Sequence, residues 1–217
     1  MLKTYLFPLA LLLLLVTACE DTARTAEDVV EETTDAAQTA IPQVTEEVAE
    51  MVDQGDLPYE VKVIDDKIKS QRKELVGEVN GIPLTINYGS PAVNDRIIYG
   101  DLVPFEKVWR TGANEATRIT FTEDVIVGTD KKELAAGTYS LFTLPNSKDD
   151  WTIIFNKTAN QWGAYDYEES QDAARAHGVA SPAKAKAERM DFAIDEDSVK
   201  LMWDDLVVAF PVTKVSK

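Results

Sequence analysis

Short apolar segments with period-two alternation recur after residue 57, and they limit the fold more than any other feature of the chain. Residues 59–63 (YEVKV) and 117–122 (TRITFT) alternate as half-buried strands do. Asn80-Gly81 separates two further apolar runs, at 75–79 and 82–86. This dipeptide predicts a β-hairpin, because both residues tolerate the positive φ of a type I′ turn.

More strands are expected at short intervals, at 125–127, 137–144, 151–155, 190–194, 199–203 and 206–212. No helical segments alternate with them, so residues 57–217 predict an all-β domain, an antiparallel β-sandwich or open barrel of about 8–10 short strands. Residues 173–187 are ambiguous. Their alanines favour helix, whereas Gly178 and Pro182 oppose a long one, so we expect a strand or an irregular link.

The first residues predict a signal peptide over 1–18. The positively charged Lys3 precedes an apolar run from Leu6 to Val16. This run is shorter than the roughly 20 residues that a membrane-spanning helix needs. Small residues then lead to Cys19, as in a bacterial lipobox. We therefore expect a lipid on Cys19, the membrane as a partner, and a place in the bacterial cell envelope, on the periplasmic face or the outer-membrane surface. An ordinary cleavable signal is the alternative.

Residues 19–56 predict a flexible acidic tether. They are rich in Ala, Thr, Glu and Asp, contain no aromatic residue, and have Arg24 as their one basic residue. Such a segment buries too little apolar surface to offset the entropy of ordering it. The alternative is an amphipathic helix that binds a partner.

Charge and residue types exclude several functions. The formal net charge is −16, so phosphate backbones would be repelled and nucleic-acid binding is not expected. His177 is the only histidine and Cys19 the only cysteine, and the acidic turn 195–197 lacks a calcium-loop pattern. No Gly-x-Ser-x-Gly motif is present. We expect no metal, no cofactor and no nucleophilic triad.

Residues 88–117 concentrate Gly, Pro, aromatic and charged residues between expected strands, and they end in WRTGANEAT. The planar guanidinium of Arg110 can donate two parallel hydrogen bonds to a carboxylate or phosphate. The amide of Asn114 and the carboxylate of Glu115 follow it in the sequence. The candidate ligand-binding residues are Trp109, Arg110, Asn114, Glu115, Trp162, Tyr167 and Asp172. The structural alternative is a buried Arg110–Glu115 ion pair with both tryptophans in the core.

Several stretches carry a resemblance to a known family. They are 88–91 (YGSP), 96–100, 102–104, 108–117 (VWRTGANEAT), 136–142 (AGTYSLF), 151–157 and 161–163. In these the chain resembles a bacterial family of unknown function, DUF2911. The resemblance implies a β-rich, secreted or lipid-anchored envelope protein and brings no activity with it.

Three functions follow from these observations. We expect a non-enzymatic, lipid-anchored envelope protein that binds a small polar ligand, a glycan or a protein partner through the WRTGANE loop. The first alternative is a glycosidase-like envelope hydrolase that uses Glu115 and Asp172 as its two carboxylates. The second is a purely structural or assembly lipoprotein.

Overall fold

A computed structural model describes residues 57–216, which form ten β-strands and one 3₁₀ turn, Glu169–Gln171. The strands are β1 (Tyr59–Asp65), β2 (Gln71–Val79), β3 (Ile82–Ser90), β4 (Thr117–Phe121), β5 (Val125–Val127), β6 (Lys132–Leu134), β7 (Gly137–Pro145), β8 (Asp150–Asn156), β9 (Asp172–Ile194) and β10 (Ser198–Lys214). The predicted signal peptide (1–18), the tether (19–56) and Cys19 lie outside the described residues.

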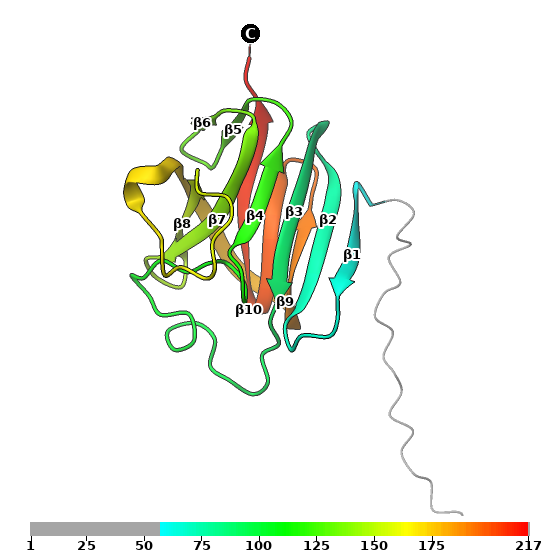
Figure 1. The fold of residues 1–217 in the computed structure, drawn as a ribbon, viewed down its shortest axis with the longest axis vertical. Helices are drawn as coiled ribbons and strands as arrows, with labels where there is room; N and C mark the ends of the chain where they lie inside the picture. Colours follow the sequence, from blue (N-terminus) through cyan, green and yellow to red (C-terminus); the bar gives the residue numbers. More distant parts are fainter. Residues whose placement is uncertain (1–56, 217) are drawn as a thin grey trace, which may run out of the picture. The chain divides into compact units, whose positions relative to one another are not determined.

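The ten strands form one antiparallel sheet in the order β1-β2-β3-β4-β7-β8-β9-β10-β5-β6. The sheet curls, so that β9 and β10 lie behind β3 and β4 (Figure 1). Aromatic contacts cross between these layers: the Tyr88 and Phe192 ring centroids are 5.0 Å apart, and those of Phe155 and Phe210 are 5.8 Å apart. The predicted all-β antiparallel class is therefore confirmed, as a single open sheet folded over its own core.

The Asn80-Gly81 hairpin is confirmed. Val79 pairs with Ile82, and the two turn residues have φ angles of 53° and 67°. Both angles lie in the left-handed region that a type I′ turn requires.

The ambiguous stretch 173–187 is strand throughout, within the 23-residue β9. β8 pairs with its first part, ending at Asp150↔Val179, and β10 pairs beyond that point, with Val208 opposite Ala180. Pro182 lies past the last β8 pair, where its missing N–H removes no bond from that ladder. Pairing with neighbouring strands thus overrides the helix preference of the alanines.

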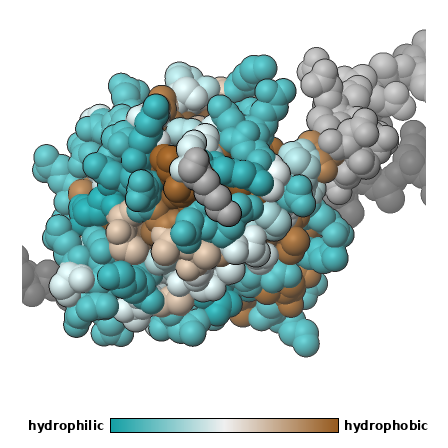
Figure 2. All heavy atoms as spheres, turned by 90° about the horizontal axis from the view of Figure 1, so that it is seen from above, coloured by the Kyte–Doolittle hydropathy of each residue, from teal (hydrophilic) through white to brown (hydrophobic). Residues whose placement is uncertain are grey.

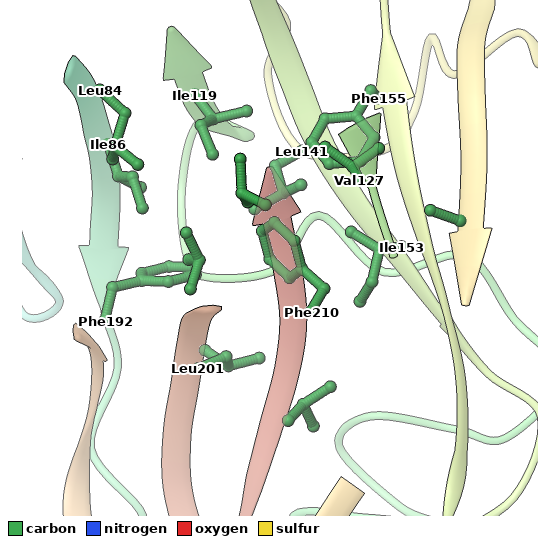
Figure 3. Close-up of a cluster of buried hydrophobic side chains, with 14 of the residues drawn as sticks. Leu84, Ile86, Ile119, Val127, Leu141, Ile153, Phe155, Phe192, Leu201 and Phe210 are labelled. Carbon is green, nitrogen blue, oxygen red and sulfur yellow. The ribbon is translucent and has the colours of Figure 1, made fainter. Parts of the chain in front are cut away.

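Alternate side chains of the strands fill the core between the two halves of the sheet. Figure 3 labels Leu84, Ile86, Ile119, Val127, Leu141, Ile153, Phe155, Phe192, Leu201 and Phe210. Each fully buried side chain of this size contributes about 1.5–3 kcal/mol to the free energy of unfolding.

Viewed from above, the surface is mostly hydrophilic, with apolar side chains in separate patches (Figure 2).

The opposite face of the sheet carries a row of polar residues. The strand registers place them directly across from one another, from β2 to β9: Glu74, Asn87, Arg118, Ser140, Asn156 and Asp172. The 157–171 loop covers part of this row, since Thr158 O accepts a bond from Ser140 and Asn160 Oδ1 accepts one from Arg118. Beside the row, Phe142 and Ile154 form a second small apolar cluster with Ala116.

Candidate functional site

Residues 109–116 (WRTGANEA) are fixed at one end of the sheet by backbone bonds on two sides. Trp109 exchanges two backbone bonds with Thr143 of β7, at 2.8 and 2.9 Å. Ala116 N donates to Gln161 O at 3.0 Å, which joins the segment to the 157–171 loop. The Trp109 ring stacks on Trp203 of β10, with centroids 5.8 Å apart.

Gly89 of β3 allows the segment to cross the sheet closely. A Cβ at this position would lie 2.1 Å from the carbonyl oxygen of Ala113. Only glycine fits such an approach of backbone to backbone.

Two residues of the segment have left-handed backbones, Thr111 with φ 54° and Asn114 with φ 63°. Asparagine adopts this conformation readily, but a β-branched residue does so at a cost. Buried Thr111 is held there by bonds from its Oγ1 to Thr143 Oγ1 at 3.2 Å and to Trp109 O at 3.3 Å. Strained positions of this kind concentrate at ligand sites.

A cavity of about 230 Å³ lies beside this segment, and we call it the Arg110 cavity. Its lining includes Trp109, Arg110, Asn114, Trp203, Lys69 and Arg96. Three of these side chains are cationic, and none of the described residues that line the cavity is acidic. The cavity is therefore positive in a chain whose formal net charge is −16.

Two donors of the Arg110 cavity lack acceptors. Arg110 Nε and Trp203 Nε1 are buried and have no hydrogen-bond partner among the described residues. Burial lowers the pKa of Arg110, and only the hydroxyl of nearby Tyr165 opposes the shift. A buried donor left without a partner costs about 1–3 kcal/mol, so an anion that accepted from these groups would recover that energy.

Glu115 belongs to a different cavity from Arg110. Its Oε2 lies 3.3 Å from Arg72 Nη1, and both residues line a cavity of about 320 Å³ that we call the Arg72 cavity. The structural alternative, an Arg110–Glu115 ion pair, is therefore wrong, because Glu115 pairs with Arg72.

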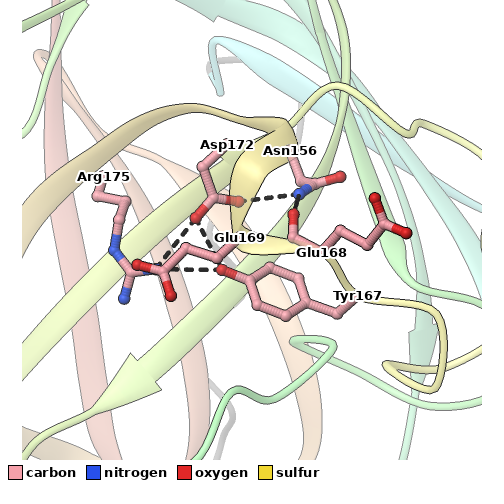
Figure 4. A network of polar contacts seen from close by, with 6 residues as sticks. All are labelled: Asn156, Tyr167, Glu168, Glu169, Asp172 and Arg175. Atoms are coloured by element: carbon pink, nitrogen blue, oxygen red, sulfur yellow. Dashed lines mark hydrogen bonds and ion pairs between the residues drawn. The ribbon is translucent and has the colours of Figure 1, made fainter.

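Asp172 and Tyr167 are joined in a polar network at the β9 end of the polar row (Figure 4). The Asp172 carboxylate accepts from Asn156 Nδ2 at 2.8 Å, from the Tyr167 hydroxyl at 2.7 Å and from Arg175 Nη1 at 3.0 Å. Its side chain is only 6% exposed. Burial, with the hydrogen bond to Asp172, raises the pKa of Tyr167.

Of the candidate residues predicted from the sequence, the structure brings together Trp109, Arg110 and Asn114. Glu115 lines the neighbouring cavity, and Trp162, which is 59% exposed, pairs with Glu115 in an isolated β-bridge. Tyr167 and Asp172 occupy the separate network, so Glu115 and Asp172 are engaged by different arginines.

Other elements bring residues to these cavities that were not predicted from the sequence. Lys69 comes from the β1–β2 connection, Arg96 from the loop after β3, and Trp203 from β10. Arg72 and Arg118 of the second cavity come from β2 and β4. Arg96 falls within the family-resemblance stretch 96–100, but no local motif marks it or the others as part of a site, since only the folded chain places them beside the WRTGANEA segment.

Within residues 57–216, no group of three or more His, Cys, Asp or Glu side chains has an arrangement suited to holding a metal ion. The same part of the chain contains no helix with the length and apolarity needed to cross a bilayer.

Fold and cavities together define a curled antiparallel β-sheet domain with polar cavities built around one crossing segment. The model of a family described as proteins of unknown function, DUF2911, matches residues 70–212, and the chain belongs to that family. The match covers β2 to β9 completely and confirms the resemblance noted in the sequence. A search of curated proteins found no match, and neither did a search of solved structures.

Proposed function

We propose that this chain is a lipid-anchored envelope protein whose β domain binds a small anion in the Arg110 cavity. One observation carries the proposal: Lys69, Arg96 and Arg110 line one cavity without an acidic neighbour among its described lining residues. Three cations that line one partly enclosed site repel one another, and a bound anion relieves that repulsion.

The size and donors of the cavity favour a compact oxyanion. A cavity volume of about 230 Å³ suits phosphate, sulfate or a short carboxylate. Arg110 provides a guanidinium, Trp203 an indole N–H, and Asn114 a side-chain amide. The acidic surface elsewhere then disfavours large polyanions, so the proposed ligand is small.

Calorimetric titration of the full-length chain with phosphate, sulfate and succinate tests this proposal. At least one anion should bind, and Arg110→Gln should weaken it about tenfold or more, because a hydrogen bond to a charged group contributes about 1.5–3 kcal/mol. Raising the salt concentration should also weaken binding.

Lys184→Gln is the matched control. It removes one positive charge from an exposed position of β9 and leaves the cavity unchanged. The proposal fails if no anion binds, or if Lys184→Gln lowers the affinity as much as Arg110→Gln does.

The anchoring part of the proposal is supported by the lipobox-like sequence that ends at Cys19. Two or three acyl chains would hold the domain firmly at the envelope, where a single chain gives only marginal binding. Cells fed a fatty-acid analogue should label the wild-type chain and not a Cys19→Ala variant. Equal labelling of the two would rule out acylation at Cys19.

A further inference from the structure

The Arg72 cavity is built from the four adjacent strands β1 to β4, the WRTGANEA segment and the 157–171 loop. Arg72 comes from β2, Asn87 from β3 and Arg118 from β4, with Asn87 and Arg118 directly paired in register. Asn160 and Gln161 of the 157–171 loop complete the polar lining, and the volume is about 320 Å³. Side chains on paired strands have fixed spacing, so this cavity lies on a rigid frame.

The charges in the Arg72 cavity leave one guanidinium without a carboxylate. Glu115 pairs with Arg72, whereas Arg118 Nη1 donates only to the neutral Asn160 Oδ1, at 2.7 Å, among the described residues. Burial is the largest effect on the pKa of Arg72 and lowers it; the charge of Glu115 opposes this shift, and the charge of Arg118 adds a smaller lowering. Two arginines facing one carboxylate make this a place for one more negative group.

Two residues that line the cavity carry acceptor oxygens without a donor. Gln161 Nε2 donates to Asn156 Oδ1 at 3.1 Å and to Thr158 O at 2.8 Å, while its Oε1 is buried with no partner among the described residues. Glu115 uses Oε2 for Arg72 and its side chain is 48% exposed, so it retains an oxygen for a ligand. A buried amide oxygen and a carboxylate together suit a positively charged donor.

We propose that the Arg72 cavity binds a small zwitterion, an α-amino acid. Its carboxylate pairs with Arg118 and Arg72, and its ammonium group donates to Glu115 and to Gln161 Oε1. This site uses none of the residues that line the Arg110 cavity, so it stands independently of the anion proposal.

Three probes separate the two charges of the ligand, and two of them, L-alanine and lactate, are of nearly equal size. L-Alanine carries both charges, lactate replaces the ammonium with a hydroxyl, and ethylamine lacks the carboxylate. In calorimetric titrations of the full-length chain, L-alanine or the larger L-glutamine should bind at least about tenfold more tightly than lactate or ethylamine, because each of these two probes lacks one of the charged contacts.

Two substitutions locate the site. Arg118→Gln should weaken amino-acid binding about tenfold or more, whereas Arg110→Gln should leave it unchanged. Circular dichroism and a thermal unfolding curve establish that Arg118→Gln remains folded, and Glu115→Gln provides a second variant on the ammonium side.

The proposal is overturned if neither amino acid binds, if lactate binds as well as L-alanine, or if both Arg118→Gln and Glu115→Gln leave the affinity intact. Loss of amino-acid binding in Arg110→Gln would also overturn it, by placing the ligand in the other cavity. Phosphate, sulfate and succinate titrations of the same variants report separately on the Arg110 cavity.

Discussion

At the residue scale, Gly89 controls how closely the WRTGANEA segment crosses the sheet. Gly89→Ala would place its Cβ 2.1 Å from the Ala113 carbonyl oxygen, and backbone on both sides resists movement. We expect a loss of about 1–3 kcal/mol or more in the free energy of unfolding, measured by urea denaturation. Anion binding in the Arg110 cavity should weaken as well, since Ala113 and Asn114 line it.

Gly178→Ala is the control for this effect. There the nearest atoms belong to the Ile153 side chain, at 2.9 Å, which can adjust. Its cost should be smaller than that of Gly89→Ala, and an equal or larger cost would contradict the close-crossing argument.

Asp172 is a structural acceptor, and its substitution should affect stability. Asp172→Asn removes the charge that holds Arg175 and Tyr167 at a nearly buried site, so we expect a loss of about 1–3 kcal/mol in urea denaturation. Glu169→Gln removes the other carboxylate near Arg175, at 3.3 Å but 75% exposed, and should cost less than about 1 kcal/mol. Similar losses in both variants would argue against a network centred on Asp172.

At the element scale, the 157–171 loop is attached to the outer face of the sheet through a few apolar contacts. The Phe142 ring of β7 meets Tyr167 edge-on, with centroids 5.0 Å apart, and Ile154 of β8 packs in the same cluster. Phe142→Ala should cost about 3–5 kcal/mol and increase hydrogen exchange in the loop, because its apolar anchor is lost.

Leu144→Ala is a milder comparison, since Leu144 only borders this cluster. If Phe142→Ala leaves exchange in the loop unchanged, then Phe142 does not anchor the loop.

Sequence periodicity predicted most of the strands and the Asn80-Gly81 hairpin, because both depend on residues that are adjacent in the chain. It left β9 unresolved over 173–187, where alanines, a glycine and a proline give no clear local preference and pairing with β8 and β10 decides. The residues that line the cavities were harder to predict from the sequence than the strands. Arg110 was identified, but Lys69, Arg96 and Trp203 reach it only through the curl of the sheet.

At the scale of the whole molecule, buried tyrosines should make the fold sensitive to alkali. Burial is the largest cause of a raised pKa at Tyr59, Tyr88, Tyr99, Tyr139 and Tyr167. The unfolded chain releases these protons near pH 10, before the folded chain does. The stability that these tyrosines contribute is therefore fully present below about pH 10, and it falls as the pH rises above that value.

Urea denaturation at a series of alkaline pH values measures this dependence. Tyr88→Phe should make the decline shallower, because Tyr88 is fully buried and donates to Asp191. An unchanged decline in that variant would assign the alkaline instability to other groups.

The Trp203 indole N–H offers the most direct test of the Arg110 cavity as an anion site. Trp203 Nε1 has no partner among the described residues, whereas Trp151 Nε1 already donates to Lys148 O at 3.1 Å and serves as an internal reference. NMR spectra of the ¹⁵N-labelled chain, with the indole peak assigned by Trp203→Phe, follow both groups during titration with phosphate, sulfate or succinate. We predict that the Trp203 indole proton moves downfield on saturation while that of Trp151 stays in place, and that Arg110→Gln suppresses the shift. A Trp203 peak that does not move at saturation, or that moves equally in Arg110→Gln, would contradict the proposed site.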